Sequence, residues 1–340
     1  MRAGLANTVN EMHIVGPGSK YLDRFCYRLA IDVARNGARQ RKMKRRTFLS
    51  ICGGLLLFLG PARSMQRARA AVPSTGANLL SAPLEVHGDW RDSPRGDAEA
   101  VISRVREACL SGLHLLSDHQ PDQLRVDNQI SGPPHIWLHS DNPTTAWIVV
   151  DVAPCAWSQL AYQFGHELGH VMCNSWMWNV ETPPPSRWIE ECLAEAFSIR
   201  GLGRLAYAWE QNPPFAGDVK YGQPLRDYRR ELIEKYQKAG GTEPVRDLAA
   251  WFRSNRTHLD RAPGIGVCAG PAIVAVLSEM EADKGCVEDL GALNRWPERS
   301  RVPLEVYLRL WQASCAEIKA PGLLPARLQE AFDLHGPDDP

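Results

Sequence analysis

The segment His166-Glu167-Leu168-Gly169-His170 constrains this chain more than any other feature, because its two histidines stand four residues apart. On an α-helix, residues i and i+4 lie on the same face. Two imidazoles placed in this way can hold one Zn²⁺, each at about 2.0–2.1 Å. Glu167 then lies beside the open coordination position, where it can take a proton from water. The H-E-x-x-H pattern therefore predicts a helix with a metal site on one face.

The surroundings of this segment favour a helix. Apolar residues recur at helical spacing from about residue 156 to 174, and Pro154 stands where a helix can begin. Gly165 and Gly169 each weaken a helix by about 1 kcal/mol relative to Ala. Because both are small, they leave room for a neighbouring element beside the metal-binding face.

A second helix is predicted from about residue 187 to 201. Three consecutive prolines interrupt the chain before it, and Ser186 is a good N-cap residue. Catalytic zinc usually has a third protein ligand. Glu191 and Glu195 lie four residues apart on one face of this helix, whereas Glu190 points about 100° away from Glu191. Glu190 and Glu191 therefore cannot both face one metal. Alternatively, all three are surface acids, which the helix dipole favours near an N-terminus.

From about residue 155 to 200 the chain resembles the gluzincin class of zinc metallopeptidases. In that class, H-E-x-x-H is followed after about twenty residues by a second helix. In this chain, residues 188–191 (W-I-E-E) match the beginning of that second helix. The resemblance implies that Glu191 is the third metal ligand, with His166 and His170. It also implies that Glu195 holds the far N–H of a zinc histidine. The glycine-rich substrate motif of zinc aminopeptidases is absent upstream, which argues against that branch.

The resemblance further implies hydrolysis of peptide bonds in a peptide or protein substrate, with Zn²⁺ as cofactor and Glu167 as general base. Gluzincins also use a Tyr or His to stabilise the oxyanion. The sequence does not choose among four candidates, which are Tyr207, Tyr221, Tyr228 and His258. In gluzincins an open strand edge pairs with extended substrate. Residues 146–152 and 135–139 are the two candidates for that edge.

Two other interpretations remain open. The same residues can belong to a zinc-stabilised peptide-binding or scaffolding protein with little turnover, because a fold does not by itself imply activity. A purely structural site does not need a general base, so Glu167 favours the enzyme. The third interpretation is hydrolysis of a non-peptide amide or ester by the same centre.

The N-terminal part of the chain has the layout of an export signal. Arg45 and Arg46 precede a short apolar run, and residues 68–70 (A-R-A) offer a small-x-small cleavage site. We therefore expect a twin-arginine signal peptide at residues 43–70, the twin-arginine export machinery as a partner, and a periplasmic or secreted protein. Membrane attachment is expected only if this signal stays uncleaved. Residues 1–42 are interpreted as an unstructured upstream extension.

The charge of the chain is divided unevenly. Residues 1–70 hold 14 of the 39 basic residues and 3 of the 39 acidic ones, so the remainder has 25 basic against 36 acidic residues, a net charge of −11. An acidic domain without a basic patch is not expected to bind nucleic acid.

The predicted fold class is α+β with a zincin-like layout. Residues 71–153 are expected to form a small α/β lobe with a short sheet. Residues 154–340 are expected to hold the two zinc helices and a mostly helical C-terminal lobe. Seven of the nine cysteines follow residue 70. Cys173 and Cys192 can join the two zinc helices by a disulfide, or both can be small buried residues.

Overall fold

The computed structural model describes residues 78–129, 132–177, 184–239, 245–262, 264 and 269–334. All of them belong to one compact unit, Arg67–Pro340. The extension predicted for residues 1–42 and the signal peptide predicted for residues 43–70 lie outside the described residues. Among the described helices, none combines the length and apolar character needed to cross a membrane.

Four strands form one mixed sheet in the order β1-β2-β4-β3. They are β1 (Leu84–Gly88), β2 (Gln123–Asn128), β3 (His135–Ile136) and β4 (Thr145–Val150). Strands β1, β2 and β4 are parallel, and β3 runs antiparallel to β4. The prediction of an open edge at residues 146–152 is wrong, because β4 pairs with a strand on each side. The two edge strands are β1 and β3, and β3 lies within the other candidate, residues 135–139.

Strand β2 was not predicted, and its sequence signal is weak. Leu124 and Val126 alternate with polar residues, but Asp127 and Asn128 are poor strand formers. The strand forms because Leu124 and Val126 are fully buried between β1 and β4. Burial in the sheet therefore outweighs the local preference of its last two residues.

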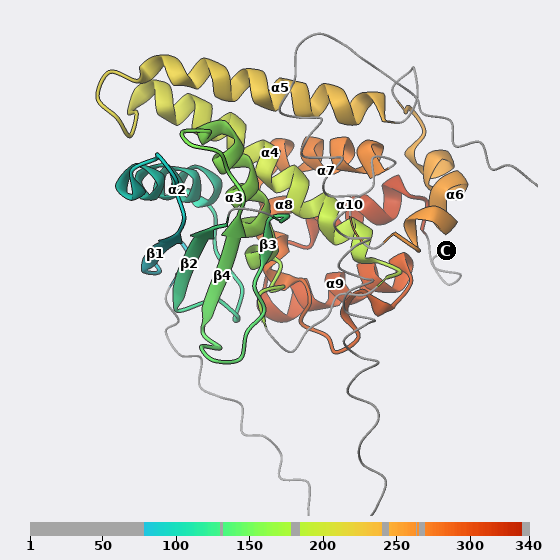
Figure 1. The fold of residues 1–340 in the computed structure, drawn as a ribbon. Helices are drawn as coiled ribbons and strands as arrows, with labels where there is room; N and C mark the ends of the chain where they lie inside the picture. The colour runs from blue at the N-terminus through green and yellow to red at the C-terminus, as the bar shows by residue number, and fades with distance from the viewer. Residues whose placement is uncertain are drawn as a thin grey trace, which may run out of the picture. The chain divides into compact units, whose positions relative to one another are not determined.

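Two helices cover one face of the sheet, namely α2 (Arg95–Leu110) and α3 (Trp157–Met172) (Figure 1). Ile148 of β4 points toward this covered face and is fully buried. Trp147 points to the opposite face, where Cζ of Arg125 lies 3.7 Å from the centre of its ring. The alternation along β4 thus separates the core from an aromatic surface.

Helix α4 (Arg187–Gln211) is the central helix of the fold and packs along α3, α2, α5 and α7. It continues to Gln211 instead of ending near residue 201, even though Gly201 and Gly203 lie within it. Tertiary packing explains this, because a Cβ at Gly201 would lie 2.3 Å from Sγ of Cys109 in α2. The glycine is thus a close contact between two helices and not a helix end.

The remaining elements are helical. They are the 3₁₀ helices η1 (Val219–Tyr221), η3 (Asp289–Ala292) and η4 (Arg299–Arg301), and the α-helices α5 (Gly222–Lys238), α6 (Leu248–Leu259), α7 (Gly270–Ala282), α8 (Lys284–Glu288), α9 (Leu304–Ile318) and α10 (Leu323–Ala331). The fold is α+β, as predicted, with a small sheet followed by a mostly helical part. Helix α2 packs against both α3 and α4, so the two predicted lobes meet through it.

Candidate metal centre

Helices α3 and α4 approach each other closely beside the histidines. A Cβ at Gly169 would lie 2.9 Å from Cα of Ala194, and a Cβ at Gly165 would lie 3.0 Å from Oγ of Ser198. Distances under about 3.4 Å are tighter than ordinary van der Waals contact. The predicted reason for these two glycines is therefore confirmed, since they make room for the neighbouring helix.

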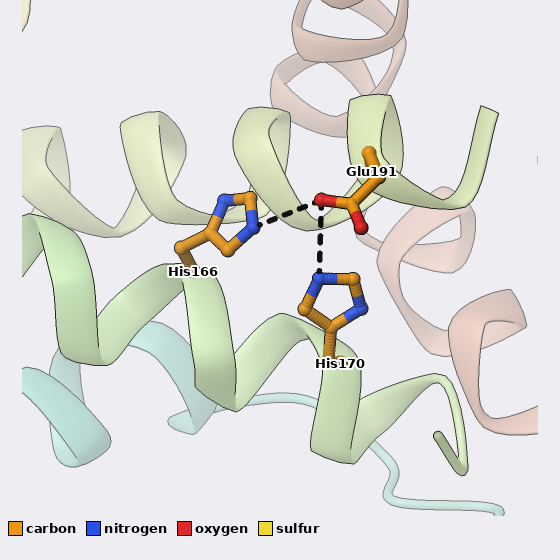
Figure 2. A group of neighbouring side chains, drawn as sticks. All are labelled: His166, His170 and Glu191. Atoms are coloured by element: carbon orange, nitrogen blue, oxygen red, sulfur yellow. Dashed lines mark ion pairs between the residues drawn. The ribbon is translucent and has the colours of Figure 1, made fainter. Parts of the chain in front are cut away.

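This close packing brings three predicted metal ligands together (Figure 2). Nε2 of His166 lies 3.4 Å, and Nε2 of His170 lies 3.5 Å, from the same atom, Oε2 of Glu191. All three ligand atoms lie within 4.8 Å of one another. Each side chain keeps between 12% and 17% of its surface exposed, so the group is accessible from solvent. The three residues form a group that could bind a metal ion.

The other carboxylate oxygen of Glu191 is held by a cation. Nε of Arg187, one helical turn earlier in α4, lies 3.5 Å from Oε1 of Glu191. The two oxygens of this carboxylate therefore have different partners, and Oε2 alone faces the two histidines.

Glu195 lies against the far side of His166, where the resemblance places a second carboxylate. Nδ1 of His166 is 2.9 Å from Oε2 of Glu195. The other oxygen, Oε1, accepts hydrogen bonds from the hydroxyls of Tyr162 at 2.6 Å and Tyr236 at 2.8 Å. Glu195 is only 1% exposed. Burial raises the pKa of Glu195, but its three partners outweigh that effect and lower the pKa. The contact with Glu195 orients the His166 ring with Nε2 toward Glu191.

Glu190 plays the matching part for the second histidine. Oε1 of Glu190 lies 3.2 Å from Nδ1 of His170 and accepts a hydrogen bond from Ser175. Oε2 accepts a hydrogen bond of 2.9 Å from Nδ2 of Asn294. Glu190 therefore touches the nitrogen that faces away from Glu191, and it is not in the ligand group.

This role of Glu190 was missed from the sequence, although one signal pointed to it. Glu190 stands among Trp188, Ile189, Cys192 and Leu193, all of which are fully buried. A carboxylate in such surroundings needs hydrogen-bonding partners. Nothing in the local spacing shows that Asn294, more than a hundred residues later, supplies one of them.

The histidines and the carboxylates of this group shift one another's pKa values, each favouring the charged form of the other. Burial by itself lowers the pKa of His166, but its hydrogen bonds with Glu191 and Glu195 outweigh that effect and raise the pKa to about 10. For the carboxyl group of Glu191, burial has the opposite effect and raises the pKa. The charge of His170 and the hydrogen bond with His166 outweigh burial and hold this pKa well below its usual range. Without metal, protonated imidazoles therefore neutralise the carboxylates. A metal ion at this position would displace those protons.

Glu167 is buried beside the ligand group and is 4% exposed. Burial raises the pKa of its carboxyl group, and the nearby charges of His166 and His170 oppose that rise. A raised carboxyl pKa suits proton transfer near neutral pH. Helix α3, which carries Glu167, packs against the edge strand β3.

The four candidate oxyanion stabilisers lie in different surroundings. Tyr207 is 67% exposed and follows Glu191 in α4 by sixteen residues, about 24 Å along a helix. The hydroxyl of Tyr221 accepts a hydrogen bond from the backbone N–H of Ser158, at the first turn of α3. Neither hydroxyl is therefore near the three ligands.

The other two candidates also lie outside the ligand group. The ring of Tyr228 packs edge-on against Tyr162 with a centroid distance of 5.8 Å, so it supports a residue that binds Glu195. His258 is exposed near the end of α6.

Of the two alternatives for Cys173 and Cys192, the disulfide between α3 and α4 is not formed, because both are free thiols. Cys173, directly after α3, is a buried free thiol. Burial raises the pKa of this thiol well above its usual range, and the charges of Glu190 and Glu191 add to the effect. Cys173 therefore behaves as a small buried residue, which was the alternative expectation.

Comparison of this chain with protein-family models, curated proteins and solved structures found no significant match.

Proposed function

We propose that this protein is a zinc-dependent metallopeptidase of gluzincin type, in which His166, His170 and Glu191 bind the ion and Glu167 is the general base. One observation carries the proposal. The Nε2 atoms of both histidines converge on one oxygen of Glu191, with Glu167 buried beside them. Two histidines and a glutamate are a known donor set of catalytic zinc.

The residues that contact the two histidines from behind also fit a zinc site. Each histidine has a carboxylate on its far nitrogen, Glu195 for His166 and Glu190 for His170. Such partners fix the tautomer and raise the basicity of a ligating imidazole. Among the described residues the group contains three ligands, which leaves one position of a tetrahedral site for water or substrate. When bound, zinc supplies a Lewis acid that polarises a carbonyl and lowers the pKa of water to about 7.

The chain itself supplies proton transfer. Glu167 accepts a proton from the attacking water and delivers it to the amine that leaves when the peptide C–N bond breaks. Its buried position supports this role because a raised pKa favours both accepting the proton and releasing it again. Arg187 and Glu195 act indirectly, since they hold Glu191 and His166 in place.

A peptide is the substrate class that the sheet supports best. The backbone N–H of Trp137 donates to the carbonyl of Trp147 in β4. Backbone groups of alternate residues in an antiparallel pair point to opposite edges, so the N–H and C=O of Ile136 point away from β4. An extended peptide can hydrogen-bond to Ile136 there, on the strand that packs against α3.

The alternative is a zinc-stabilised binding protein with little turnover. That protein would gain nothing from a buried carboxyl group with a raised pKa beside the ligands, because such burial costs stability. Glu167 therefore favours the enzyme. The experiment below separates the two alternatives directly.

The test measures zinc content and peptide hydrolysis on the same preparations of wild type, Glu167→Gln and His166→Ala. Wild type should bind one zinc ion per chain and cleave members of a broad peptide library. Glu167→Gln should keep the zinc but lose turnover by about 10²–10⁴-fold, whereas His166→Ala should lose the zinc. Hydrolysis at the wild-type rate by zinc-loaded Glu167→Gln would exclude this residue as the base. Zinc binding without hydrolysis in wild type would favour the binding protein.

Export by the twin-arginine route is part of the proposal, and it rests on the sequence alone. Replacing Arg45 and Arg46 together with lysine should leave the precursor in the cytoplasm. N-terminal sequencing of the exported protein should give a start near Ala71. Normal export of the double variant would rule out this route.

A further inference from the structure

An exposed aromatic cluster lies on the edge strand β3, the residues that follow it, and the neighbouring strand β4. Trp137 is 51% exposed, and the adjacent Leu138 is 41% exposed. The ring of Trp137 packs against Trp147 and against His135, each at a centroid distance of 6.0 Å. His139 meets Trp147 edge-on at 5.3 Å. We call these four rings, His135, Trp137, His139 and Trp147, the edge aromatic cluster.

The cluster is built on the sheet. Trp147 belongs to β4, which pairs with β2 and β3. On the same face, Arg125 stacks on Trp147 at 3.7 Å and is itself held by two hydrogen bonds of 3.0 Å to Asp127. Trp137 therefore rests on a supported surface, although half of its own side chain faces solvent. A large exposed ring on a rigid support is typical of a binding site.

The cluster lies on the strand that packs against the helix of the proposed catalytic centre. Helix α3, which carries Glu167, packs against β3. Trp137 follows His135 by two residues, about 7 Å along an extended strand, and points to the same face. The cluster therefore extends along β3, on the face of the sheet opposite α3.

The register of β3 relates the cluster to a bound peptide. Ile136 offers its backbone groups to the outer edge, and its side chain pairs with Ile148 toward the covered face of the sheet. A peptide residue opposite Ile136 would point toward the same face as Ile136. The next peptide residue would then point to the other face, onto Trp137. Only one substrate side chain at a time can lie on this ring.

Resting on the proposed function, we infer that the edge aromatic cluster is the subsite that selects one aromatic or large aliphatic side chain of an extended peptide substrate. Trp137 is the specificity-determining residue. Stacking on its ring favours an aromatic substrate residue at a single position. The neighbouring substrate positions point toward the opposite face and are not selected by this ring.

Two observations favour a peptide over a second copy of this chain as the occupant. Strand β3 packs against α3, which carries Glu167, and the outward backbone groups of Ile136 match an extended chain. Among the described residues, β4 is the only strand paired with β3. A second copy that paired through β3 would occupy the strand edge that the proposed substrate needs.

The test compares wild type, Trp137→Ala and Trp137→Phe on peptide sets that differ at one position. Wild type should prefer Phe, Tyr or Leu over Ala at one position. Trp137→Ala should reduce that preference about 3- to 10-fold, the usual worth of an aromatic pair, with unchanged zinc content. Trp137→Phe should retain part of it. Val219→Ala removes another exposed apolar side chain, 45% exposed in η1, and should leave the preference unchanged.

A binding measurement keeps this inference separate from the proposed activity. Zinc-loaded Glu167→Gln, with and without Trp137→Ala, is titrated with the same peptides. The aromatic preference in binding should disappear with Trp137, even if wild type cleaves none of the peptides. An unchanged preference in both assays, or no peptide binding at all, would overturn the inference. So would a dimer of wild type that Trp137→Ala converts to a monomer, because the cluster would then be a contact between copies.

Discussion

Gly169→Ala tests whether the spacing of two helices sets the metal centre. The added Cβ would lie 2.9 Å from Cα of Ala194 and 3.2 Å from both its Cβ and its carbonyl oxygen. Ordinary contact begins at 3.4 Å, and these are backbone atoms and a short side chain. Helices α3 and α4 must therefore separate by about 0.5 Å at this point, since rotation of a side chain cannot relieve the contact.

The consequence for stability is small, and the consequence for zinc is larger. Overpacking of this kind costs about 1–3 kcal/mol, while replacing a helical glycine by alanine returns about 1 kcal/mol. Zinc–ligand distances tolerate only about 0.2 Å. Because His170 lies on α3 and Glu191 on α4, a shift of about 0.5 Å should weaken zinc binding by about 10- to 100-fold, as loss of a supporting contact does.

The assay is zinc competition with a chelator, together with thermal unfolding of the metal-free protein. Gly96→Ala in α2 is the matched control, because a Cβ there meets nothing within 4 Å. It should keep wild-type zinc affinity and gain up to about 1 kcal/mol of stability. Wild-type zinc affinity in Gly169→Ala would refute the argument, since the helices would then accept the methyl group without moving the ligands.

Three further predictions concern the support of the ligands and their charge. Tyr236→Phe removes one of the hydroxyls that donate to Glu195 and should weaken zinc binding about 10-fold; unchanged affinity would show that the remaining donors suffice. Glu190→Gln keeps the shape of the residue but removes its charge, and chelator competition should again give about 10-fold weaker binding. Tighter binding would contradict its supporting role. The third prediction is a loss of stability of the metal-free protein as pH rises from about 6.5 toward 10, measured by urea unfolding in chelator. Burial lowers the pKa of His166, but the Glu191 and Glu195 hydrogen bonds raise it to about 10. The folded state therefore holds a proton that the unfolded chain releases near its ordinary pKa. The lowered pKa of Glu191 has the opposite sign, so its contribution is present above about pH 4.5 and is lost on acidification. Stability independent of pH between 6.5 and 9.5 would contradict the ion pairs.

The sequence by itself determined the features that depend on local spacing. The positions of His166 and His170 follow from the helical repeat, and the period is visible within one short segment. The α+β class follows from short apolar strands before residue 153 and helical patterns after it. The second metal helix was predictable from its start, because the prolines before residue 187 interrupt the chain. Glu191 as the ligand came from the resemblance, and the structure places it between the two histidines.

Only the tertiary structure decided which residues support the ligands. Glu190 and Glu195 have similar local surroundings, yet one holds His170 and the other holds His166. Their further partners Asn294 and Tyr236 come from distant parts of the chain. The order of the strands likewise placed residues 145–150 inside the sheet and β3 at its edge. Such contacts depend on how elements pack against one another, and neighbouring residues in the sequence carry little information about them.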